Sequence, residues 1–434
     1  MNLTESKIAN PTLGKRKRPP SLWSNWQIAS LLIAIAVSFL AQGFIAPIRT
    51  LYARDEGASG VALGFMAAAF LFSGFVFLFP FGWLSDRVNR PNLIIAGLIG
   101  HSLITLGFMF TTSAEMFILL RFVEGITAAA VSSPARALLA DLTPSGRNGE
   151  AFGLFSAVIT FGMFAGPPMG TLMAEITGFQ AVYLLSFLIF IPSILLVLFS
   201  YRGYSQRNAS QMDTPVAIIP AELSGTEKLL TLPIVIGCLV KGAIGLGPGV
   251  AIAIWSLFAA DLGFSLTAIG WTYTVYSIPI ILVAPWAGRF SDRVGRLLMM
   301  FSASILLSFV WMSYGIITSF LIIMIIGVVE GSIDAVSRAA TDGYLADHSP
   351  LHSRGKAQGL YNAVQQFGTL AGSLIGGLLY ENTARGMPFV IIGLLQFGLM
   401  ALAFLLYLLF RPNKKTEAAR SPTPVVGSVD TLEV

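Results

Sequence analysis

The sequence GWLSDRVNR at residues 82–90 recurs as GRFSDRVGR at residues 288–296, an offset of 288 − 82 = 206 positions. The same offset, applied without a gap, places Glu124 on Glu330 and Gly162 on Gly368. Because one offset aligns positions spread over the whole segment from residue 82 to residue 170, the match indicates a duplicated unit. We therefore expect two halves that share one structural plan.

The composition excludes a soluble protein. Hydrophobic residues make up 55% of the 434 residues and charged residues 11%, against about 25% charged residues in ordinary globular domains. A length of this order would otherwise suggest about three soluble domains. The chain lacks the polar surface that such domains need, so we expect it to lie in a membrane.

Twelve apolar stretches are each long enough to cross a bilayer, which takes about 20 residues. They lie at residues 26–48, 61–81, 92–110, 116–140, 151–173, 179–199, 232–259, 266–287, 297–317, 320–344, 357–380 and 388–410. The polar linker 202–231 separates six of them from the other six. The sequence thus predicts an all-α membrane protein with twelve transmembrane helices in two pseudo-symmetric six-helix bundles, 26–201 and 232–411, and with tails at 1–25 and 412–434.

The distribution of Lys and Arg predicts the orientation, because short cytoplasmic loops retain these residues. With the N-terminus inside, the outer loops hold only Arg49, Arg54 and Arg385. We therefore expect a monomeric, multi-pass protein of the cell membrane with both termini in the cytoplasm. The net charge of +5 then reflects membrane orientation rather than nucleic-acid binding. A cleaved signal peptide is the alternative for the N-terminus, but its apolar run is too long.

Neither a cofactor nor a metal is predicted. Cys238 is the only cysteine and the three histidines are scattered, so the ligands of a zinc site are missing. The segment GAIGLGPG at 242–249 lacks the ending of a phosphate loop, and we expect it to break or loosen the seventh helix near the substrate. The sequence offers no clustered nucleophile and base, so an enzyme is not expected. A membrane enzyme or a transport-dead sensor is the alternative from another class.

Three motifs resemble those of the major facilitator superfamily. The segment 82–90 resembles the signature G-x-L-x-D-R-x-G-R, with Asn89 in place of its second glycine, and RFVEG at 121–125 resembles R-x-x-Q-G. The pattern G-x-x-x-G-P-x-x-G of the antiporter branch is matched by Gly162, Gly166, Pro167 and Gly170. The chain is most similar to the twelve-helix drug:proton antiporters. The resemblance implies a secondary active transporter.

The repeated loop motif is expected to form a conformational latch. Its carboxylates can pair with guanidinium groups at the ends of neighbouring helices, and the resemblance implies that it joins the halves on the cytoplasmic side in the outward-open state. The alternative is that the arginines only enforce topology. The predicted latch residues are Gly82, Asp86, Arg87 and Arg90, with Gly288, Asp292 and Arg293 in the second copy.

The glycines of the fifth apolar stretch recur at intervals of four and therefore line one helical stripe. Such a stripe lets another backbone approach closely, and Pro167 is expected to bend the helix. The resemblance implies that this bend shapes the closed state and resists proton leak. Packing alone is the alternative.

Ionisable residues inside the apolar stretches are costly and are therefore candidate functional residues. Glu124 lies three positions after Arg121, and Glu330 lies four positions before Asp334, so each pair shares a helical face. At the repeat offset Arg121 falls on Gly327 and Asp334 on Ala128, so the charges break the symmetry. Proton coupling is assigned to Glu124, Glu330 and Asp334. The alternative is a set of structural ion pairs.

Two transport functions remain open from the sequence. The first is proton-coupled efflux of small organic or amphipathic molecules. The second is a carrier for an anionic or zwitterionic metabolite, with Lys241 and Arg121 as substrate ligands. The drug antiporters that the chain resembles often carry an acidic residue in their first helix, whereas the first apolar stretch here has none. This difference weakens the prediction of drug efflux. Either substrate would lie in a cavity lined by Gln42, Arg121, Lys241, Tyr273, Tyr276, Tyr361 and Gln365.

Overall fold

The computed structural model describes residues 21–144, 146–204, 231–349 and 354–410, so most of both predicted tails and of the linker lies outside the described residues. The described part is α-helical, with a short 3-10 turn at Leu22–Ser24 and without a strand. The helices are α1 Trp26–Asp55, α2 Gly60–Ser85, α3 Arg90–Phe108, α4 Ala114–Leu142, α5 Asn148–Thr177, α6 Phe179–Ser200, α8 Leu232–Asp261, α9 Leu266–Val294, α10 Arg296–Tyr314, α11 Phe320–His348, α12 Arg354–Asn382 and α13 Met387–Phe410. The predicted fold class is confirmed.

Several helices, among them α1, α2 and α9, begin at a residue whose side chain caps them. The Asn25 side chain accepts hydrogen bonds from the first free N–H groups of α1, and Ser59 and Ser265 do the same for α2 and α9. Ser59 and Ser265 are equivalent positions at the repeat offset of 206. Because an unpaired helix-terminal N–H group is costly inside a protein, these caps fix the helix starts at matching places in the two halves.

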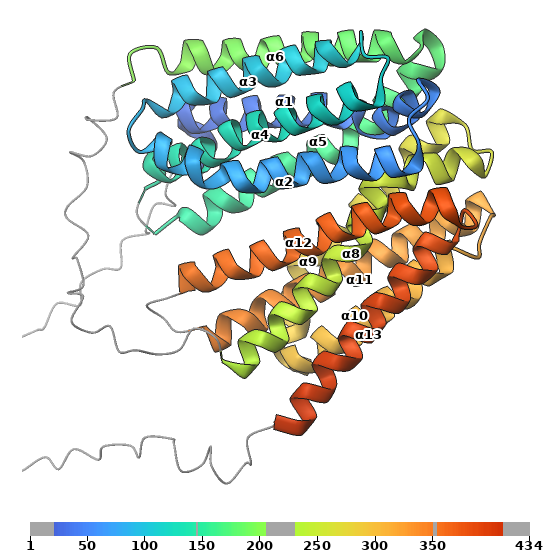
Figure 1. Cartoon of the computed structure of the whole chain (residues 1–434). Helices are drawn as coiled ribbons and strands as arrows, with labels where there is room; N and C mark the ends of the chain where they lie inside the picture. Colours follow the sequence, from blue (N-terminus) through green and yellow to red (C-terminus); the bar gives the residue numbers. More distant parts are fainter. Residues whose placement is uncertain (1–20, 145, 205–230, 350–353, 411–434) are drawn as a thin grey trace, which may run out of the picture.

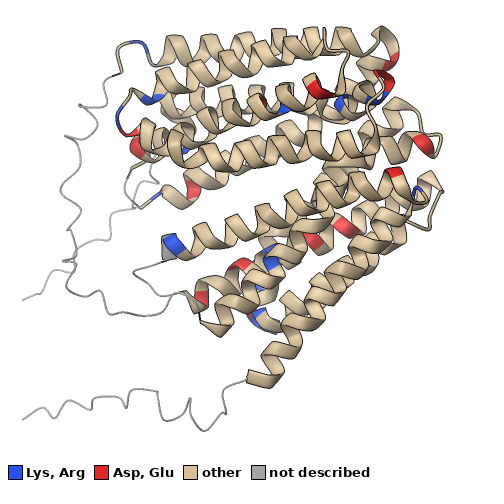
Figure 2. Ribbon diagram, viewed as in Figure 1, with Lys and Arg blue, Asp and Glu red and all other residues tan. Residues whose placement is uncertain are grey.

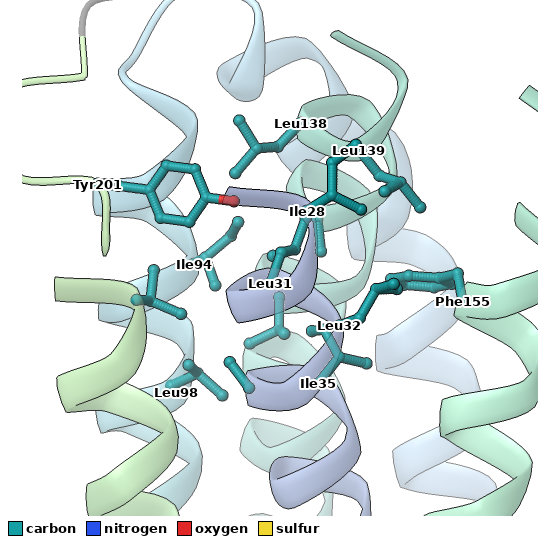
Figure 3. Packing of buried hydrophobic residues seen from close by; sticks show 14 of the residues in the cluster. Ile28, Leu31, Leu32, Ile35, Ile94, Leu98, Leu138, Leu139, Phe155 and Tyr201 are labelled. Carbon is teal, nitrogen blue, oxygen red and sulfur yellow. The ribbon is translucent and has the colours of Figure 1, made fainter. Parts of the chain in front are cut away.

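The helices form two halves, α1–α6 and α8–α13 (Figure 1). In the first half α1 packs on α5 and α2 on α4, and in the second half their equivalents α8 and α9 pack on α12 and α11. The core of the first half near the start of α1 is built from aliphatic side chains of α1, α3 and α4, with Phe155 of α5, Phe190 and Val197 of α6, and Tyr201 just after α6 (Figure 3). The duplicated sequence thus gives a duplicated packing scheme.

The halves touch near one end of the molecule. We call it the loop end, where α1 ends and α2 begins; the tail end is the opposite one, where α1 begins and α13 ends. The contacts between the halves run from α2 to α12 and from α5 to α9. At the loop end a Cβ atom on Gly64 would lie 3.1 Å from the Cα atom of Gly377, so these backbones meet closely. The halves spread apart toward the tail end (Figure 1).

Two carboxylates hold the loop end together in equivalent ways. Glu381 of α12 accepts a hydrogen bond from the Gly60 N–H group at 2.6 Å, and Glu175 of α5 accepts one from the Thr267 N–H group at 3.1 Å. Each therefore caps the start of a helix in the opposite half. An ion pair between Arg54 Nη1 and Asp261 Oδ1, at 2.6 Å, adds a third link.

Eleven of the described helices are long and apolar enough to cross a membrane. The helix that falls short is α12, which packs against α8 of its own half and α2 of the other. Because α8 and α2 cover part of its surface, α12 can carry polar residues such as Gln365 and Thr369 there. Charged residues are concentrated at the helix ends, and only a few lie within the halves (Figure 2).

Two predictions about the helices are wrong. Arg49 was expected in an outer loop, but α1 continues to Asp55 and buries Arg49 inside the first half. The segment 242–249 was expected to break or loosen its helix, but α8 is continuous from Leu232 to Asp261, so the helix is not broken there. Its glycines serve as a packing seam, since a Cβ atom on Gly245 would collide with backbone atoms of α12.

Candidate functional site

The repeated loop motif forms the same clamp in each half. Arg90 bonds to Asp86, 3.2 Å away, to Asp141 and to the carbonyl oxygen of Ala137. In the second half Arg296 bonds to Asp292 at 2.8 Å, to Asp347 at 2.7 Å and to the carbonyl oxygen of Gly343 at 2.7 Å. All four positions are equivalent at the offset of 206. Each clamp joins three consecutive helices within one half.

The other predicted latch residues do not link the halves in this conformation. The Arg87 guanidinium lies 3.7 Å from the centre of the Trp83 ring, and Gly82 lies beside Ser133 of the same half. Gly288 faces open space and Arg293 is exposed. A latch between the halves stays a prediction for a conformation in which the tail end closes. Arg296, which the prediction omitted, is the equivalent of Arg90.

The glycine stripe of α5 packs on α1. Cβ atoms on Gly162, Gly166 and Gly170 would collide with the α1 backbone around Gly43, so the two helices need these glycines for their close approach. The equivalent glycines of α12, Gly368, Gly372 and Gly376, pack on α8. Because both halves share the stripe, close packing accounts for it. The predicted role of Pro167 in proton leak stays untested.

A buried ion cluster lies in the first half. Glu124 of α4 receives hydrogen bonds from Arg49 Nη2 at 3.0 Å and from Arg121 Nη1 at 2.8 Å. The His101 Nε2 atom lies 3.4 Å from the same carboxylate, and its Nδ1 atom shares a hydrogen bond with Thr127. Glu124 is 1% exposed. Its charge is therefore neutralised from two sides.

The cluster borders a cavity of about 160 Å³, which we call the first-half cavity. Gln42, Arg49, Arg121 and Glu124 line it, together with Tyr273 from the second half. The guanidinium groups also lie over aromatic rings, Arg121 over Phe70 and Arg49 over Phe108. The cavity thus combines two cations with one carboxylate, and three of the predicted cavity residues, Gln42, Arg121 and Tyr273, line it.

The acidic pair of α11 is divided between two environments. Asp334 Oδ2 accepts hydrogen bonds from the Tyr276 hydroxyl and from Arg338 Nε, both at 2.8 Å. Glu330 accepts one from the Tyr314 hydroxyl, also at 2.8 Å. The described residues form no ion pair with Glu330. Arg338 therefore neutralises Asp334 and leaves Glu330 with a neutral partner.

Glu330 borders a second cavity, of about 180 Å³, which we call the second-half cavity. Five of its lining residues are aromatic: Trp255, Tyr273, Tyr276, Trp311 and Tyr314. The other lining residues are Pro248, Gly327, Thr272, Met324 and several aliphatic side chains. A carboxylate among aromatic faces suits an apolar molecule that carries a positive charge.

The remaining predicted cavity residues lie elsewhere. Lys241 forms an ion pair with Asp342 at 2.5 Å and donates to Gln365 at 3.5 Å, and it lines neither cavity. Tyr361 is buried in the hydrophobic core around α8 and shares a hydrogen bond with Ser349. The structure therefore does not bring Lys241 together with Arg121.

Four residues of the site were missed from the sequence: Arg49, Trp255 and Tyr314 line the two cavities, and His101 contacts Glu124. The repeat offset carried a usable signal for three of them. Arg49 is equivalent to Trp255, and Phe108, which lies under Arg49, is equivalent to Tyr314. A chemical difference at equivalent interior positions thus marks the site.

Comparison with known families agrees with this architecture. The family model of the Major Facilitator Superfamily matches residues 31–252 and again residues 238–429. The chain belongs to the major facilitator superfamily. It is therefore a multi-pass membrane transporter, and this superfamily is not a family of enzymes.

Two relatives differ in how much of the transporter they match. An uncharacterized MFS-type transporter of Methanocaldococcus jannaschii is 25% identical over 355 residues, which are 80% of this chain and 90% of that protein. The quinolone resistance protein NorA of Staphylococcus aureus is 34% identical over 177 residues, 40% of this chain and 45% of that protein. The second match thus spans less than half of NorA.

Solved structures share the fold at low sequence identity. The nucleoside transporter NupG has a TM-score of 0.68 at 15% identity, with 90% of this chain and all of that one covered. A bacterial homolog of the human lysosomal transporter Spinster has a TM-score of 0.67 at 15% identity and covers 94% of this chain. Both likenesses concern the fold alone.

Proposed function

We propose that this transporter exports small organic, amphipathic molecules in exchange for protons by alternating access. The observation that carries the proposal is the environment of Glu330. Its side chain is buried in the second half, borders an aromatic cavity and forms no ion pair with any described residue. The similarity to a part of NorA, a quinolone resistance protein by name, supports an organic substrate.

Glu330 can couple two fluxes because a carboxylate buried without a cation needs a positive charge nearby. It can take a proton, or it can take a positively charged group of a substrate. Since it does not hold both well, the binding of one favours release of the other, and this coupling is reciprocal. The aromatic rings of Trp255, Tyr273 and Tyr276 supply apolar and cation-binding faces.

The two ends of the molecule suit an alternating-access cycle. We place both termini in the cytoplasm, so that the open tail end faces the cytoplasm and the closed loop end faces the exterior. Release to the exterior then requires the helix caps made by Glu175 and Glu381 to separate, together with the Arg54–Asp261 ion pair. The Arg90 and Arg296 clamps keep each half rigid while it moves.

The test is pH-gradient-driven transport of ethidium, a fluorescent organic cation, by the full-length protein in proteoliposomes. Glu330→Gln keeps the shape of the side chain and removes its charge, so we expect gradient-driven transport to fall about tenfold or more. Glu115→Gln, at an exposed carboxylate in the first turn of α4, serves as the matched control and should transport normally. Full gradient-driven transport by the Glu330→Gln protein would refute the proposal.

A further inference from the structure

The first-half and second-half cavities are neighbours. Tyr273 and Ile252 line both of them, although the other lining residues come mainly from opposite halves. Their volumes are about 160 and 180 Å³. Taken together they reach the lower part of the range for ligand sites, roughly 300–1,000 Å³. Their combined volume is enough for one elongated molecule that passes beside Tyr273 and Ile252.

The first-half cavity has an excess of positive charge. Arg49 and Arg121 face a single carboxylate, Glu124. Both guanidinium groups are more than nine-tenths buried, and the Nε atom of each lacks a hydrogen-bond partner among the described residues. Because Glu124 offsets only one of the two buried guanidinium charges, the other can be neutralised by an anionic group that enters this cavity.

The second-half cavity has the opposite charge. Glu330 brings one carboxylate, and the described lining residues include no Lys or Arg. The hydroxyl groups of Tyr276 and Tyr314 are committed to Asp334 and Glu330. What remains for a ligand is therefore a set of aromatic faces around one negative charge, which favours an ammonium group.

We infer that the two cavities form one bipartite site for a zwitterionic aromatic molecule. Its carboxylate binds Arg49 and Arg121, its ammonium group binds near Glu330, and Tyr273 lies beside its middle. This inference rests on the proposed function and names the substrate class for the same site. A zwitterion neutralises both excess charges at once, whereas a cation or an anion of the same shape neutralises one and leaves the other buried without a partner.

The probes that test the inference are 4-(ω-aminoalkyl)benzoic acids with chains of one to four methylenes, with their methyl esters as cations and their N-acetyl derivatives as anions. Binding to the purified full-length protein is measured by isothermal titration calorimetry. We expect the best zwitterion to bind about tenfold or more tightly than either derivative of equal length, since each derivative loses one charged contact. An ester that binds as tightly as its parent acid overturns the inference.

Two substitutions assign the ends of the ligand. Arg121→Met should abolish the preference for the acid over its ester, and Glu330→Gln should abolish the preference for the acid over its N-acetyl derivative. Lys241→Met is the matched control, because Lys241 pairs with Asp342 and lines neither cavity. Both preferences should persist in it. The assignment is contradicted if Arg121→Met still prefers the acid over its ester, or if Glu330→Gln still prefers the acid over its N-acetyl derivative.

A substitute variant and a separate transport measurement distinguish failure of the bipartite site from misfolding and from failure of the proposed function. If Arg121→Met does not yield a monodisperse protein, Arg49→Lys, which keeps the charge but loses the forked donor geometry, should weaken binding of the acid and not of the ester. Equal losses for both overturn the inference. Proton-driven ethidium transport that persists while the zwitterion preference is absent rejects the bipartite site and leaves the proposed exchange function intact.

Discussion

Glu124 and Glu330 occupy equivalent positions in the two halves and have opposite surroundings. Around Glu124 the duplicated positions hold Arg49 and Arg121, and around Glu330 they hold Trp255 and Gly327. The aromatic residues differ as well. Phe70 and Phe108 lie under the two arginines, whereas their equivalents Tyr276 and Tyr314 bind the carboxylates of α11.

The comparison separates scaffold from chemistry within one chain. Features that both halves keep, such as the clamps of Arg90 and Arg296 and the glycine stripes, hold helices together. Features that differ line the two cavities. Glu124, which is neutralised by two arginines, stabilises its bundle. Glu330 has no cation beside it among the described residues and can therefore bind either a proton or a positively charged group of the substrate. The same backbone position thus supports two roles, and the residues around it decide between them.

The largest expected effect is on stability. Glu124→Ala leaves two buried guanidinium groups without a counter-ion, which costs about 3–5 kcal/mol. Glu330→Ala removes one hydrogen bond from Tyr314 and should cost about 1–2 kcal/mol, because no charge loses its partner. Thermal unfolding of both variants in detergent measures the difference. Equal destabilisation would mean that the two carboxylates are not in different charge environments.

A smaller effect should follow when the second half is made to resemble the first. Gly327 is the equivalent of Arg121, it lines the second-half cavity, and a Cβ atom there would meet ordinary contacts of 3.6 Å and longer. Gly327→Lys places a cation three residues before Glu330 on the same helical face. We expect it to neutralise Glu330 and to reduce gradient-driven ethidium transport about tenfold.

The matched control for this substitution is Gly327→Gln, which adds a side chain of similar length without charge. It should reduce transport less than Gly327→Lys does. If the two variants transport equally, bulk in the cavity is responsible rather than charge, and the comparison between the halves loses its electrostatic basis.

The smallest effects are expected at the clamps, where the halves agree. Arg90→Gln and Arg296→Gln each remove ion pairs at partly exposed carboxylates, and such pairs contribute about 1 kcal/mol or less. The two variants should therefore lower the unfolding temperature slightly and by similar amounts. A large loss at one clamp alone would show that the shared motif has different roles in the two halves.

The sequence was sufficient for the fold and its symmetry. Runs of apolar residues long enough to span lipid have few alternatives to a membrane helix, and one fixed offset aligns the two copies. The ends of the individual helices were harder to predict, because a helix can continue beyond its apolar run when its last turns are buried in protein. The last turns of α1 are of this kind, and for that reason Arg49 was assigned to a loop.

The spacing of charged residues along the sequence could not predict which of them form ion pairs inside the bundles. Glu330 and Asp334 lie on one helical face, and both Arg338 and Lys241 were available to neutralise them. Packing decides the outcome, since α8 and α11 bring Lys241 to Asp342. Tyr314 comes from α10 and reaches Glu330 only in the folded bundle. Periodicity gives the face of a helix, whereas the choice of partner depends on neighbouring helices.

The polarity of α12 has a consequence for biosynthesis. A segment that gains little free energy from acyl chains is not retained in the bilayer by its own partitioning. We therefore expect α12 to reach its final depth late, together with the strongly apolar α13 and after α8 is in place to receive its glycines. The nascent second half would then be most exposed to quality-control proteases during the interval before those two helices dock.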